Sequence, residues 1–334
     1  MNLLNPAALF STKLIHAALE LAASDIHFCP FTSTVKIYFR IHGKRIFHYE
    51  IDSKQYQVLV SYYKFTAGMD IGETRSPQNG AITFPYKQQT ISLRLSTLPV
   101  NGSESLAIRL LPQQETISLN QLFLFPYQLN SIKQWITNRS GVILFTGPTG
   151  SGKTTTLYAL LQALLQEQSY QTITLEDPIE KEIQDLLQVQ VNEKSGITYQ
   201  AGLKAALRHD PDILMVGEIR DEKTAQFVFH AAYTGHLVLS TLHAKNAFGT
   251  IHRLNEMGIR KTDLDQNLIA VASLELFPVL TKGQVPSRAA ILELLDGEVL
   301  QEAINGTTNE KNPKFHTFDQ LRRKAVAYGY AKYS

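Results

Sequence analysis

Cysteine is almost absent from this chain of 334 residues, because Cys29 is the only one. A single thiol excludes a disulfide within the chain and a zinc site built from several cysteines, and it is typical of a reducing compartment. An excess of charge is lacking too, since 32 basic and 30 acidic residues leave a formal net charge of +2. Proteins that wrap nucleic acid nonspecifically usually carry a larger basic excess, so we expect no direct nucleic-acid binding.

A membrane span and an export signal are also missing from the sequence pattern. No stretch approaches the roughly 18 uninterrupted apolar residues that a spanning helix needs. The nearest, residues 268–280, is shorter and contains Ser273 and Glu275. Residues 1–10 have neither the basic leader nor the apolar core of a signal peptide. We therefore expect a cytoplasmic protein that associates with the cytoplasmic membrane only peripherally, through partners.

Residues 1–111 combine one helical pattern with several strand-like runs. Apolar residues recur at helical spacing over 7–23, and short runs follow that are separated by turn signals such as Asn79-Gly80 and Asn101-Gly102. This combination predicts a small α+β domain. Over residues 112–118 the pattern gives way to a proline and several polar residues, which predict a linker.

Residues 119–334 show a different arrangement of apolar residues. Short apolar runs of the buried-strand type, at 142–146, 172–175, 213–216 and 237–241, alternate with helical segments. Such alternation predicts an α/β fold in which a mostly parallel sheet is covered on both faces. We expect the last part, residues 262–334, to be mainly helical. Its basic tail is either a solvated surface or a site for lipid or for a partner.

One glycine-rich segment carries the strongest chemical signal. The residues that match the phosphate-binding pattern G-x-x-x-x-G-K-[ST] are Gly147, Pro148, Thr149, Gly150, Ser151, Gly152, Lys153 and Thr154, and Thr155 follows them. Glycines let backbone N–H groups close around phosphate oxygens, and the start of the next helix adds partial positive charge. We expect Lys153 to reach the β- and γ-phosphates of ATP and the Thr154 hydroxyl to hold Mg²⁺. The segment therefore predicts a P-loop domain that binds a nucleotide.

Three further blocks carry acidic or histidine side chains near strand ends. Glu176 and Asp177 follow the second predicted strand, Glu218 follows the third, and His236 and His243 flank the fourth. In open α/β sheets the groups that bind ligands gather at the carboxyl ends of the strands. These blocks therefore predict a nucleotide site with several carboxylates beside the P-loop.

In their order and spacing, the four blocks resemble those of the secretion-type ATPases, the cytoplasmic motors of type II secretion, type IV pili and competence pseudopili. They are similar to that family's Walker A motif, aspartate box, Walker B motif and histidine box. The resemblance extends into the first half of the chain through residues 23–27, residues 76–80 and the arginine-bearing strands near 94 and 109. It implies a RecA-like P-loop NTPase domain preceded by a PAS-like α+β domain. It also implies a homo-hexamer that hydrolyses ATP and acts on a polytopic inner-membrane platform protein.

Several departures from the family pattern narrow this resemblance. Many assembly-type members carry two C-x-x-C pairs after the histidine box, but residues 274–288 contain no cysteine. We expect the extra N-terminal domain of the family to be missing. The usual Gln-Asp-Gly-Arg turn is Gln78-Asn-Gly-Ala81, which lacks the arginine. These departures describe a short assembly-type member without a zinc site, and in this respect the chain most resembles the competence ATPases of Gram-positive bacteria. The function expected is assembly of a competence pseudopilus or a similar filament for DNA uptake.

ATP hydrolysis needs a group that orients water, a metal ion and a cation for the transition state. We assign the orientation of water to Glu218. Gly217 stands where many P-loop ATPases have a magnesium-holding aspartate, so we expect Glu176 and Asp177 to help with the metal. Thr154, Glu176 and Glu218 would then surround the Mg²⁺ that arrives with the nucleotide.

The histidines and two arginines complete the candidate site. His236 and His243 are seven residues apart, too far for a zinc pair on one helix. The resemblance implies that both are donors near the γ-phosphate. Arg208 is either a cation at a subunit interface or part of a solvated ion pair, and we expect Arg220 to form a local salt bridge with Asp221.

Arg94 and Arg109 are predicted to face each other across a hairpin. A turn centred on Asn101-Gly102 pairs residues whose numbers sum to 203, so Arg94 lies opposite Arg109. Like charges in this position are unfavourable unless an anion lies near, and the flanking residues of these two strands supply no carboxylate. The alternative is that both side chains extend into water. The resemblance implies instead that they reach the γ-phosphate as arginine fingers when the domains close.

Three other functions remain open at this point. A retraction motor of the same family is disfavoured only because its terminal helix motif is not recognisable. A conjugation-type translocation ATPase would need basic, aromatic-lined loops, which the sequence does not show. A nucleotide-dependent scaffold would bind ATP but hydrolyse it negligibly.

Overall fold

The computed structural model describes residues 6–41, 43–87, 89–100, 102–112, 118–167, 170–192, 196–279 and 287–330. The chain divides into two units, Met1–Glu115 and Thr116–Ser334. The linker predicted at residues 112–118 lies mostly outside the described residues, which do not include 113–117.

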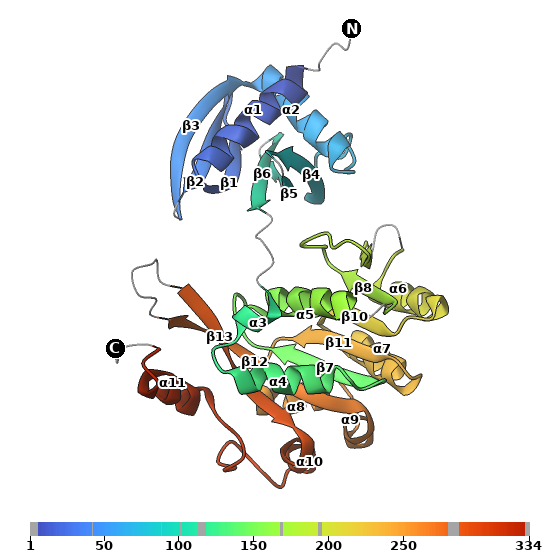
Figure 1. The fold of residues 1–334 in the computed structure, drawn as a ribbon. Coiled ribbons are helices and arrows are strands. Elements are labelled where there is room, and N and C mark those ends of the chain that lie inside the picture. Colours follow the sequence, from blue (N-terminus) through green and yellow to red (C-terminus); the bar gives the residue numbers. More distant parts are fainter. Residues whose placement is uncertain are drawn as a thin grey trace. The chain divides into compact units, whose positions relative to one another are not determined.

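A six-stranded antiparallel sheet forms unit 1, with the strand order β3-β2-β1-β6-β5-β4 (Figure 1). Its strands are β1 (Ala23–Pro30), β2 (Thr34–Ile41), β3 (Lys44–Asp52), β4 (Gln78–Tyr86), β5 (Gln89–Val100) and β6 (Ser103–Pro112). Helices α1 (Pro6–Glu20) and α2 (Ser53–Thr66) pack on one face of this sheet. The α+β character that the alternating runs predict for this part of the chain is therefore confirmed.

Alternation along the strands builds the core of unit 1. Val35, Ile37 and Phe39 of β2 are almost fully buried against the helices, while the residues between them face the other side of the sheet. Helix α1 ends three residues earlier than the sequence pattern predicts, at Glu20, because Ala22 adopts the left-handed conformation with φ of 51°. Leu21, which the helical pattern places on the apolar face, is consequently half exposed.

A buried ion pair crosses the core side of unit 1. The Nζ atom of Lys64 on α2 lies 2.5 Å from Oε2 of Glu104 on β6, and the two side chains are only 1% and 5% exposed. Lys64 also donates to the backbone oxygen of Glu73 at 2.7 Å, and Tyr56 donates to the backbone oxygen of Glu104 at 2.7 Å. These contacts tie α2 to β6 and to the loop that precedes β4.

Unit 2 contains a seven-stranded sheet with the order β13-β12-β7-β11-β10-β8-β9. Its strands are β7 (Gly141–Thr146), β8 (Thr172–Glu176), β9 (Leu187–Gln190), β10 (Ile213–Ile219), β11 (Leu237–Leu242), β12 (Leu268–Val279) and β13 (Ser287–Asp296). All neighbouring pairs are parallel except β12 and β13, which are antiparallel. The mostly parallel α/β sheet predicted from the sequence is thus confirmed.

Helices cover both faces of this sheet. One face carries α3 (Leu119–Leu122), α4 (Pro126–Trp135) and α5 (Lys153–Glu167). The other carries α6 (Tyr199–Ala206), α7 (Glu222–Tyr233), α8 (Ala247–Glu256), α9 (Lys261–Asn267) and α10 (Gly297–Asn305). Every residue of β7 and β11 is buried, as expected for central parallel strands (Figure 1).

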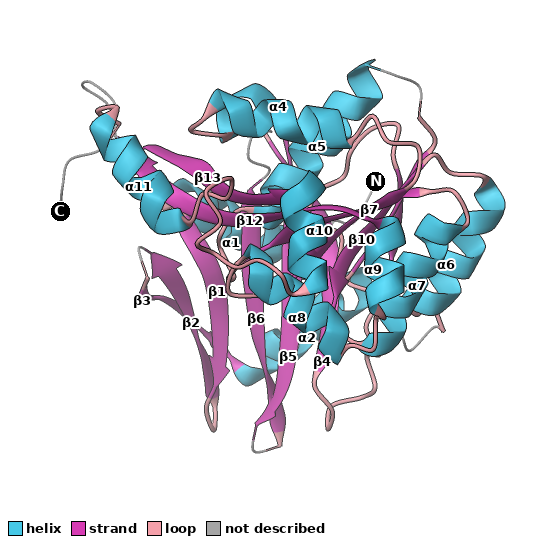
Figure 2. Cartoon of the chain, turned by 90° about the horizontal axis from the view of Figure 1, so that it is seen from below, coloured by secondary structure: helices cyan, strands magenta, loops and turns pink. Residues whose placement is uncertain are grey.

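The expectation of a mainly helical C-terminal part is wrong. Residues 268–279 and 287–296 form β12 and β13, and β12 lies between β13 and β7, one strand in from the edge of the sheet (Figure 2). A continuous apolar run has the same appearance in a buried strand as in a buried helix, so periodicity could not separate them. Helices α9 and α10 and the last helix, α11 (Phe318–Ala327), account for the helical remainder among the described residues.

Helix α11 is anchored beside β12 and β13. Leu321 and Ala325 are buried against this strand pair, and Arg322 donates two hydrogen bonds to Glu275, at 2.8 and 2.7 Å. The Lys324 ammonium lies over aromatic rings, including that of Tyr127 at 5.0 Å. Much of the basic tail is therefore engaged within unit 2. No helix of the described residues is both long and apolar enough to pass through a membrane.

Candidate active site

The glycine-rich segment lies between the end of β7 and the start of α5, as its sequence context predicts. Gly150 has a φ of 81°, a conformation that residues with a side chain rarely adopt. Gly147 has a φ of 137°, and a Cβ atom there would lie 2.7 Å from the backbone oxygen of Leu274 on β12. Glycine is therefore required at both positions, and the loop packs directly against β12.

Lys153 is held by the loop that it follows. Its Nζ atom donates to the backbone oxygens of Gly147 at 2.8 Å and of Pro148 at 2.9 Å, and the residue is 8% exposed. Burial lowers the pKa of Lys153, although the negative charge of Glu218 opposes this shift. The ammonium is thus positioned over the loop before any phosphate arrives.

The residues of the loop fit a polyanionic ligand. The Oγ atom of Ser151 is buried and has no hydrogen-bond partner among the described residues. Thr154 and Thr155 lie in the first turn of α5, whose free backbone N–H groups and dipole favour an anion. An unpaired hydroxyl, a desolvated ammonium and a helix N-terminus together suit phosphate oxygens.

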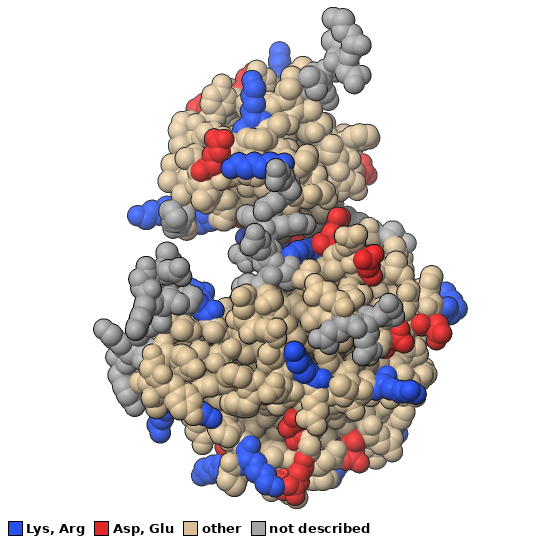
Figure 3. All heavy atoms as spheres, viewed as in Figure 1, with Lys and Arg blue, Asp and Glu red and all other residues tan. Residues whose placement is uncertain are grey.

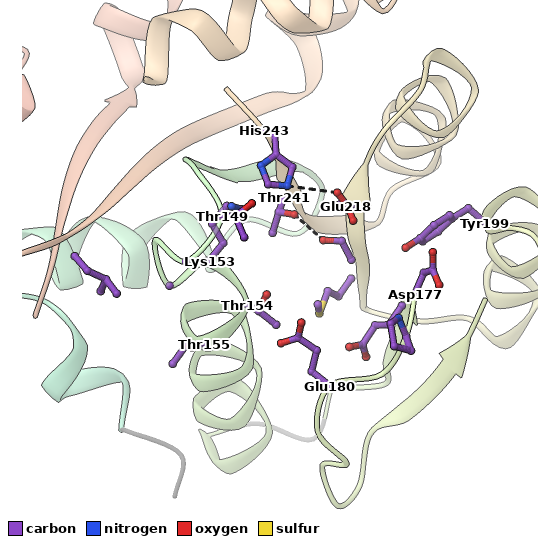
Figure 4. Close-up of a pocket in the computed structure, with 17 residues that line it drawn as sticks. Thr149, Lys153, Thr154, Thr155, Asp177, Glu180, Tyr199, Glu218, Thr241 and His243 are labelled. Carbon is purple, nitrogen blue, oxygen red and sulfur yellow. Dashed lines mark hydrogen bonds and ion pairs between the residues drawn. The ribbon is translucent and has the colours of Figure 1, made fainter. Parts of the chain in front are cut away.

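A pocket of about 480 Å³ lies beside the P-loop, at the carboxyl ends of the strands (Figure 4). Among the residues predicted from the sequence, the structure brings Thr149, Gly150, Gly152, Lys153, Thr154, Thr155, Glu176, Asp177, Glu218 and His243 into its lining. The lining also contains Glu180, a third carboxylate of the block that holds Glu176 and Asp177, and residues that the sequence reasoning missed: Pro178, Tyr199, Met215, Thr241 and Leu276. Figure 4 shows side chains from the P-loop, β8, β10 and β11 converging on one space.

Glu218 lies between a histidine and an arginine. Nε2 of His243 is 3.6 Å from one carboxylate oxygen of Glu218, and Nη2 of Arg220 forms an ion pair with the other oxygen. The Glu218 side chain is 22% exposed, so it is accessible from the pocket. The hydroxyl of Thr241 donates to the backbone oxygen of Gly217 at 2.7 Å and fixes the strand end beneath Glu218 (Figure 4).

Glu176 is surrounded by donors. It is 3% exposed, and its carboxylate accepts hydrogen bonds from Thr174 at 2.6 Å, from Gln188 at 3.1 Å and from the hydroxyl of Tyr158. Burial raises the pKa of Tyr158 and the charge of Glu176 raises it further, so the phenol stays protonated and donates. No feature of the sequence pointed to Tyr158 or Gln188, which lie on other elements.

Asp177 is more accessible than Glu176. Its side chain is 42% exposed and forms an ion pair with Nη1 of Arg220 at 3.0 Å. The aromatic ring of Tyr199 lies nearby on α6, and burial followed by the negative charge of Asp177 raises the pKa of its hydroxyl. The carboxylate of Asp177 is therefore accessible at the edge of the pocket, whereas that of Glu176 is enclosed.

His236 lies at the other end of β11. It comes before Leu237, the first residue of that strand, and its Nδ1 atom lies 3.1 Å from both the hydroxyl of Thr234 and the backbone oxygen of Ala231. Six strand residues separate it from His243, which corresponds to about 20 Å. The expectation that both histidines lie near the γ-phosphate is therefore wrong for the pocket of their own chain. A catalytic role for His236 stays a prediction.

Arg94 and Arg109 lie on the sheet of unit 1. The predicted register is confirmed, because Arg94 pairs with Arg109, Leu93 with Leu110 and Leu95 with Ile108. Asn101 of the predicted turn lies outside the described residues.

A carboxylate does lie near Arg109, but it comes from a third strand, outside the two strands that the sequence analysis considered. Asp25 on β1 is opposite Arg109, and its Oδ1 atom accepts from Nε of Arg109 at 2.9 Å. Arg40 on β2 approaches the other oxygen of Asp25 at 3.7 Å. Burial alone would raise the pKa of Asp25, but hydrogen bonds from Ser24 and Arg109 outweigh it and lower the pKa.

No group of three or more His, Cys, Asp or Glu side chains in the described parts of the chain is arranged as a metal-binding cluster. A magnesium ion that enters with a nucleotide needs no such cluster, because phosphate oxygens, waters and one or two protein oxygens complete its octahedron. The Thr154 hydroxyl and the accessible carboxylates of Asp177 and Glu218 line the same pocket and suit that role.

Comparison with known proteins agrees with this geometry. Residues 4–316 match the family described as Type II/IV secretion system protein. The competence protein ComGA of Bacillus subtilis (strain 168) is 43% identical over 334 residues, which cover 96% of this chain and 94% of that protein. The crystal structure of the pilus retraction motor PilT with bound ADP has a TM-score of 0.66 and 26% identity, over 96% of this chain and 89% of that chain.

The fold has a further counterpart in the ATPase DotB of Legionella pneumophila. Its structure has a TM-score of 0.75 and 22% identity, over 97% of this chain and 93% of that chain. The family match spans most of both units and includes the P-loop, the carboxylate blocks and the histidine block. The chain therefore belongs to the type II/IV secretion system protein family and is a secretion-type ATPase.

Proposed function

We propose that this protein is an ATP-hydrolysing motor that assembles a pilus-like filament, most specifically a competence pseudopilus for DNA uptake. The observation that carries the proposal is the convergence of Lys153, Glu218 and His243 on one pocket beside a P-loop. The identity of 43% to a competence protein, over nearly the full length of both chains, supports the specific process.

Binding of ATP is the first step, and the P-loop residues perform it. Backbone N–H groups of the loop and the start of α5 face the phosphate oxygens, and the Lys153 ammonium moves from the loop carbonyls to the β- and γ-phosphates. Thr154 supplies a hydroxyl at the same place. Mg²⁺, when bound with the nucleotide, neutralises charge that develops on the phosphates.

Hydrolysis is the second step, and Glu218 performs it. One of its oxygens is directed to His243 at 3.6 Å, and the carboxylate borders the pocket, so it can orient a water toward the γ-phosphate. Contact between His243 and the γ-phosphate would then couple the presence of that phosphate to the position of α8, which begins four residues later at Ala247. Glu176 is enclosed and accepts hydrogen bonds from Tyr158 and Thr174, so in this scheme it supports the strand end beside the metal. Thr154, Asp177 and Glu218 are the residues that would approach the ion.

Arg94 and Arg109 supply the transition-state charge in this proposal. When unit 1 closes over the nucleotide, their guanidinium groups reach the γ-phosphate and act as arginine fingers, which elsewhere contribute roughly 10³–10⁵ in rate. Their position opposite each other on β5 and β6 supports this role, because two guanidinium groups on neighbouring strands can approach one phosphate.

The motor would act as a cytoplasmic homo-hexamer on a polytopic platform protein of the inner membrane. Opening and closing of successive subunits would turn or lift that partner. On the face drawn in Figure 3, basic and acidic side chains are scattered rather than gathered in one broad basic patch. This distribution and the net charge of +2 support a protein partner over nucleic acid.

Phosphate release tests the enzymatic part of the proposal. The purified full chain should hydrolyse ATP in a Mg²⁺-dependent way, and Lys153→Ala should abolish hydrolysis and weaken nucleotide binding, because it removes the cation that meets the phosphates. Wild-type turnover no higher than that of Lys153→Ala would identify a nucleotide-dependent scaffold instead. Stimulation of the wild-type rate by single-stranded DNA would identify a translocation ATPase.

A clean gene deletion, scored for DNA uptake and for surface filaments, tests the biological part. Loss of both, restored by the wild-type gene but not by the Lys153→Ala gene, is the expected result. Filaments that persist or become more numerous in the deletion strain would indicate a retraction motor and would contradict assembly.

A further inference from the structure

Arg220 lies between two carboxylates of the candidate active site. It directly follows β10, and its guanidinium group contacts Asp177 through Nη1 at 3.0 Å and Glu218 through Nη2. Glu218 and Asp177 belong to the ends of β10 and β8, which are neighbouring parallel strands. One side chain therefore connects two strand ends at the edge of the pocket.

The contact expected from the sequence, between Arg220 and Asp221, is not the one the structure places there. Asp221 is the N-cap of α7 and accepts a hydrogen bond from the backbone N–H of Thr224 at 2.7 Å. Its carboxylate is thus engaged in starting the helix. Arg220 points instead toward the nucleotide site, where the sequence analysis gave it no role.

We propose that Arg220 is a positioning residue for ATP hydrolysis, which holds the carboxylates of Asp177 and Glu218 in fixed directions. This inference rests on the proposed function of Glu218. With one oxygen of Glu218 bound by Arg220, the other is directed to His243 and to the space where the attacking water would lie.

The geometry requires an arginine rather than any cation. A guanidinium group is planar and presents several N–H donors in a fixed fork, so it binds two carboxylates at once and fixes the angle between them. An ammonium group is a point charge on a flexible stem and fixes no such angle. The hydrogen bond that Arg220 donates to Glu218 raises the pKa of Arg220 further above its usual range, so the group stays charged.

Removing the arginine should change the rate and not the affinity for ATP. Without it, the like charges of Asp177 and Glu218 repel and Glu218 loses its direction. A misplacement of about 1 Å at a catalytic group can cost roughly 10²-fold in rate. For Arg220→Ala we expect kcat to fall by about 10–100-fold, while KM and the affinity for a fluorescent non-hydrolysable ATP analogue change less than threefold.

Two comparisons separate positioning from charge or folding. Arg220→Lys keeps the charge without the fork, so it should recover only a small part of the lost kcat. Arg253→Ala removes an exposed arginine that pairs only locally with Glu256 on α8, and it serves as the matched control with wild-type kcat. Full recovery by Arg220→Lys would overturn the two-carboxylate arrangement, and a wild-type kcat for Arg220→Ala would overturn the inference altogether.

A double variant tests whether Arg220 acts through Glu218. If it does, Arg220→Ala should cause no further loss of kcat in a Glu218→Gln chain, since residues that act as a unit are not additive. Equal losses in both backgrounds would show that Arg220 acts elsewhere. If Glu218→Gln alone keeps the wild-type rate, the proposed function of Glu218 fails, which is distinguishable from failure of Arg220→Ala alone.

A readout without nucleotide completes the test. In the full chain without ATP, Arg220→Ala should lower the thermal unfolding midpoint slightly, because it leaves two neighbouring carboxylates unneutralised. Adding Asp177→Asn to Arg220→Ala should restore part of this loss. If Asp177→Asn lowers the midpoint further in that chain, the two carboxylates are not held by Arg220, and the inference is contradicted.

Discussion

The two units contain ion clusters of opposite composition. In unit 1, one carboxylate, Asp25, lies between two guanidinium groups, those of Arg40 and Arg109. In unit 2, one guanidinium group, that of Arg220, lies between the carboxylates of Asp177 and Glu218. The first cluster has a surplus of positive charge and the second a surplus of negative charge. A phosphate group suits the first, and a metal ion or a water to be activated suits the second.

The comparison teaches that neither cluster is balanced by itself. Structural ion pairs usually neutralise each other, as Lys64 and Glu104 do in the core of unit 1. A cluster that keeps a surplus of one sign near a pocket or on an open sheet face is suited to an incoming ligand. Of the four predictions below, the first two test whether the arginines of unit 1 and the carboxylates of unit 2 serve one reaction, and the last two test the stability of unit 1.

The largest effect is expected from Arg109 of the positive cluster together with Arg94, which pairs with it on the neighbouring strand. Arg94→Ala with Arg109→Ala should reduce the hydrolysis rate by roughly 10³-fold or more, because it removes the charge proposed for the transition state. ATP affinity in the open state should stay mostly intact. The measurement is single-turnover phosphate release by the full chain.

Lys54→Ala, at an exposed position on α2, is the matched control in unit 1. If the double arginine variant folds, assembles and hydrolyses ATP at the control rate, the positive cluster belongs to the fold of unit 1 alone.

The negative cluster should give the next largest effect. Glu218→Gln is nearly isosteric and should keep ATP bound while it lowers turnover by roughly 10²–10⁴-fold, as expected for loss of a group that orients or deprotonates water. Bound ATP and released phosphate should be measured on the same sample. Turnover at the wild-type rate would transfer the role to Glu176.

The neutral pair in unit 1 should affect stability and not chemistry. Lys64→Met leaves Glu104 buried without its partner, which should cost about 3–5 kcal/mol in the unfolding of unit 1. Lys64→Met combined with Glu104→Leu replaces the pair by apolar groups and should recover most of that loss. Thermal unfolding of the full chain, followed together with phosphate release at a low temperature, separates the two properties. A double variant that is no more stable than the single one would contradict this account.

The smallest effect concerns Asp25 and pH. Its pKa is lowered in the folded protein, so its contribution to stability is present above the unfolded pKa of about 3.9 and is lost as the pH falls through the folded pKa. Arg109 is 63% exposed, so Asp25→Asn should cost at most about 1 kcal/mol at pH 7. Unfolding in denaturant at neutral pH and near pH 3 should show that the difference between Asp25→Asn and wild type shrinks in acid. A difference that grows in acid would exclude the lowered pKa.

Local patterns predicted the phosphate loop and the hairpin of unit 1 well. The glycines and Lys153 form a contiguous motif whose chemistry allows few alternatives, and the Asn-Gly turn sets the pairing of Arg94 with Arg109. Both are short-range features, in which neighbouring residues carry the whole signal.

Features that depend on distant segments were missed. Tyr158 and Gln188 reach Glu176 from α5 and β9, and Asp25 reaches Arg109 from another strand. Such contacts depend on sheet order, which local patterns do not contain. The run at 268–279 was misassigned because a strand buried on both faces shows no alternation.

The contacts of Lys153 have a consequence for selectivity among anions. Its ammonium group is already desolvated and bound to two loop carbonyls, at 2.8 and 2.9 Å. An incoming anion must compete with these neutral acceptors, so a single weak anion gains little by displacing them. A nucleoside triphosphate offers several charged oxygens at once, and charge-assisted hydrogen bonds are roughly twice as strong as neutral ones. The loop therefore binds nucleoside triphosphates in preference to small anions, because only a triphosphate gains more from the ammonium than the displaced carbonyls lose.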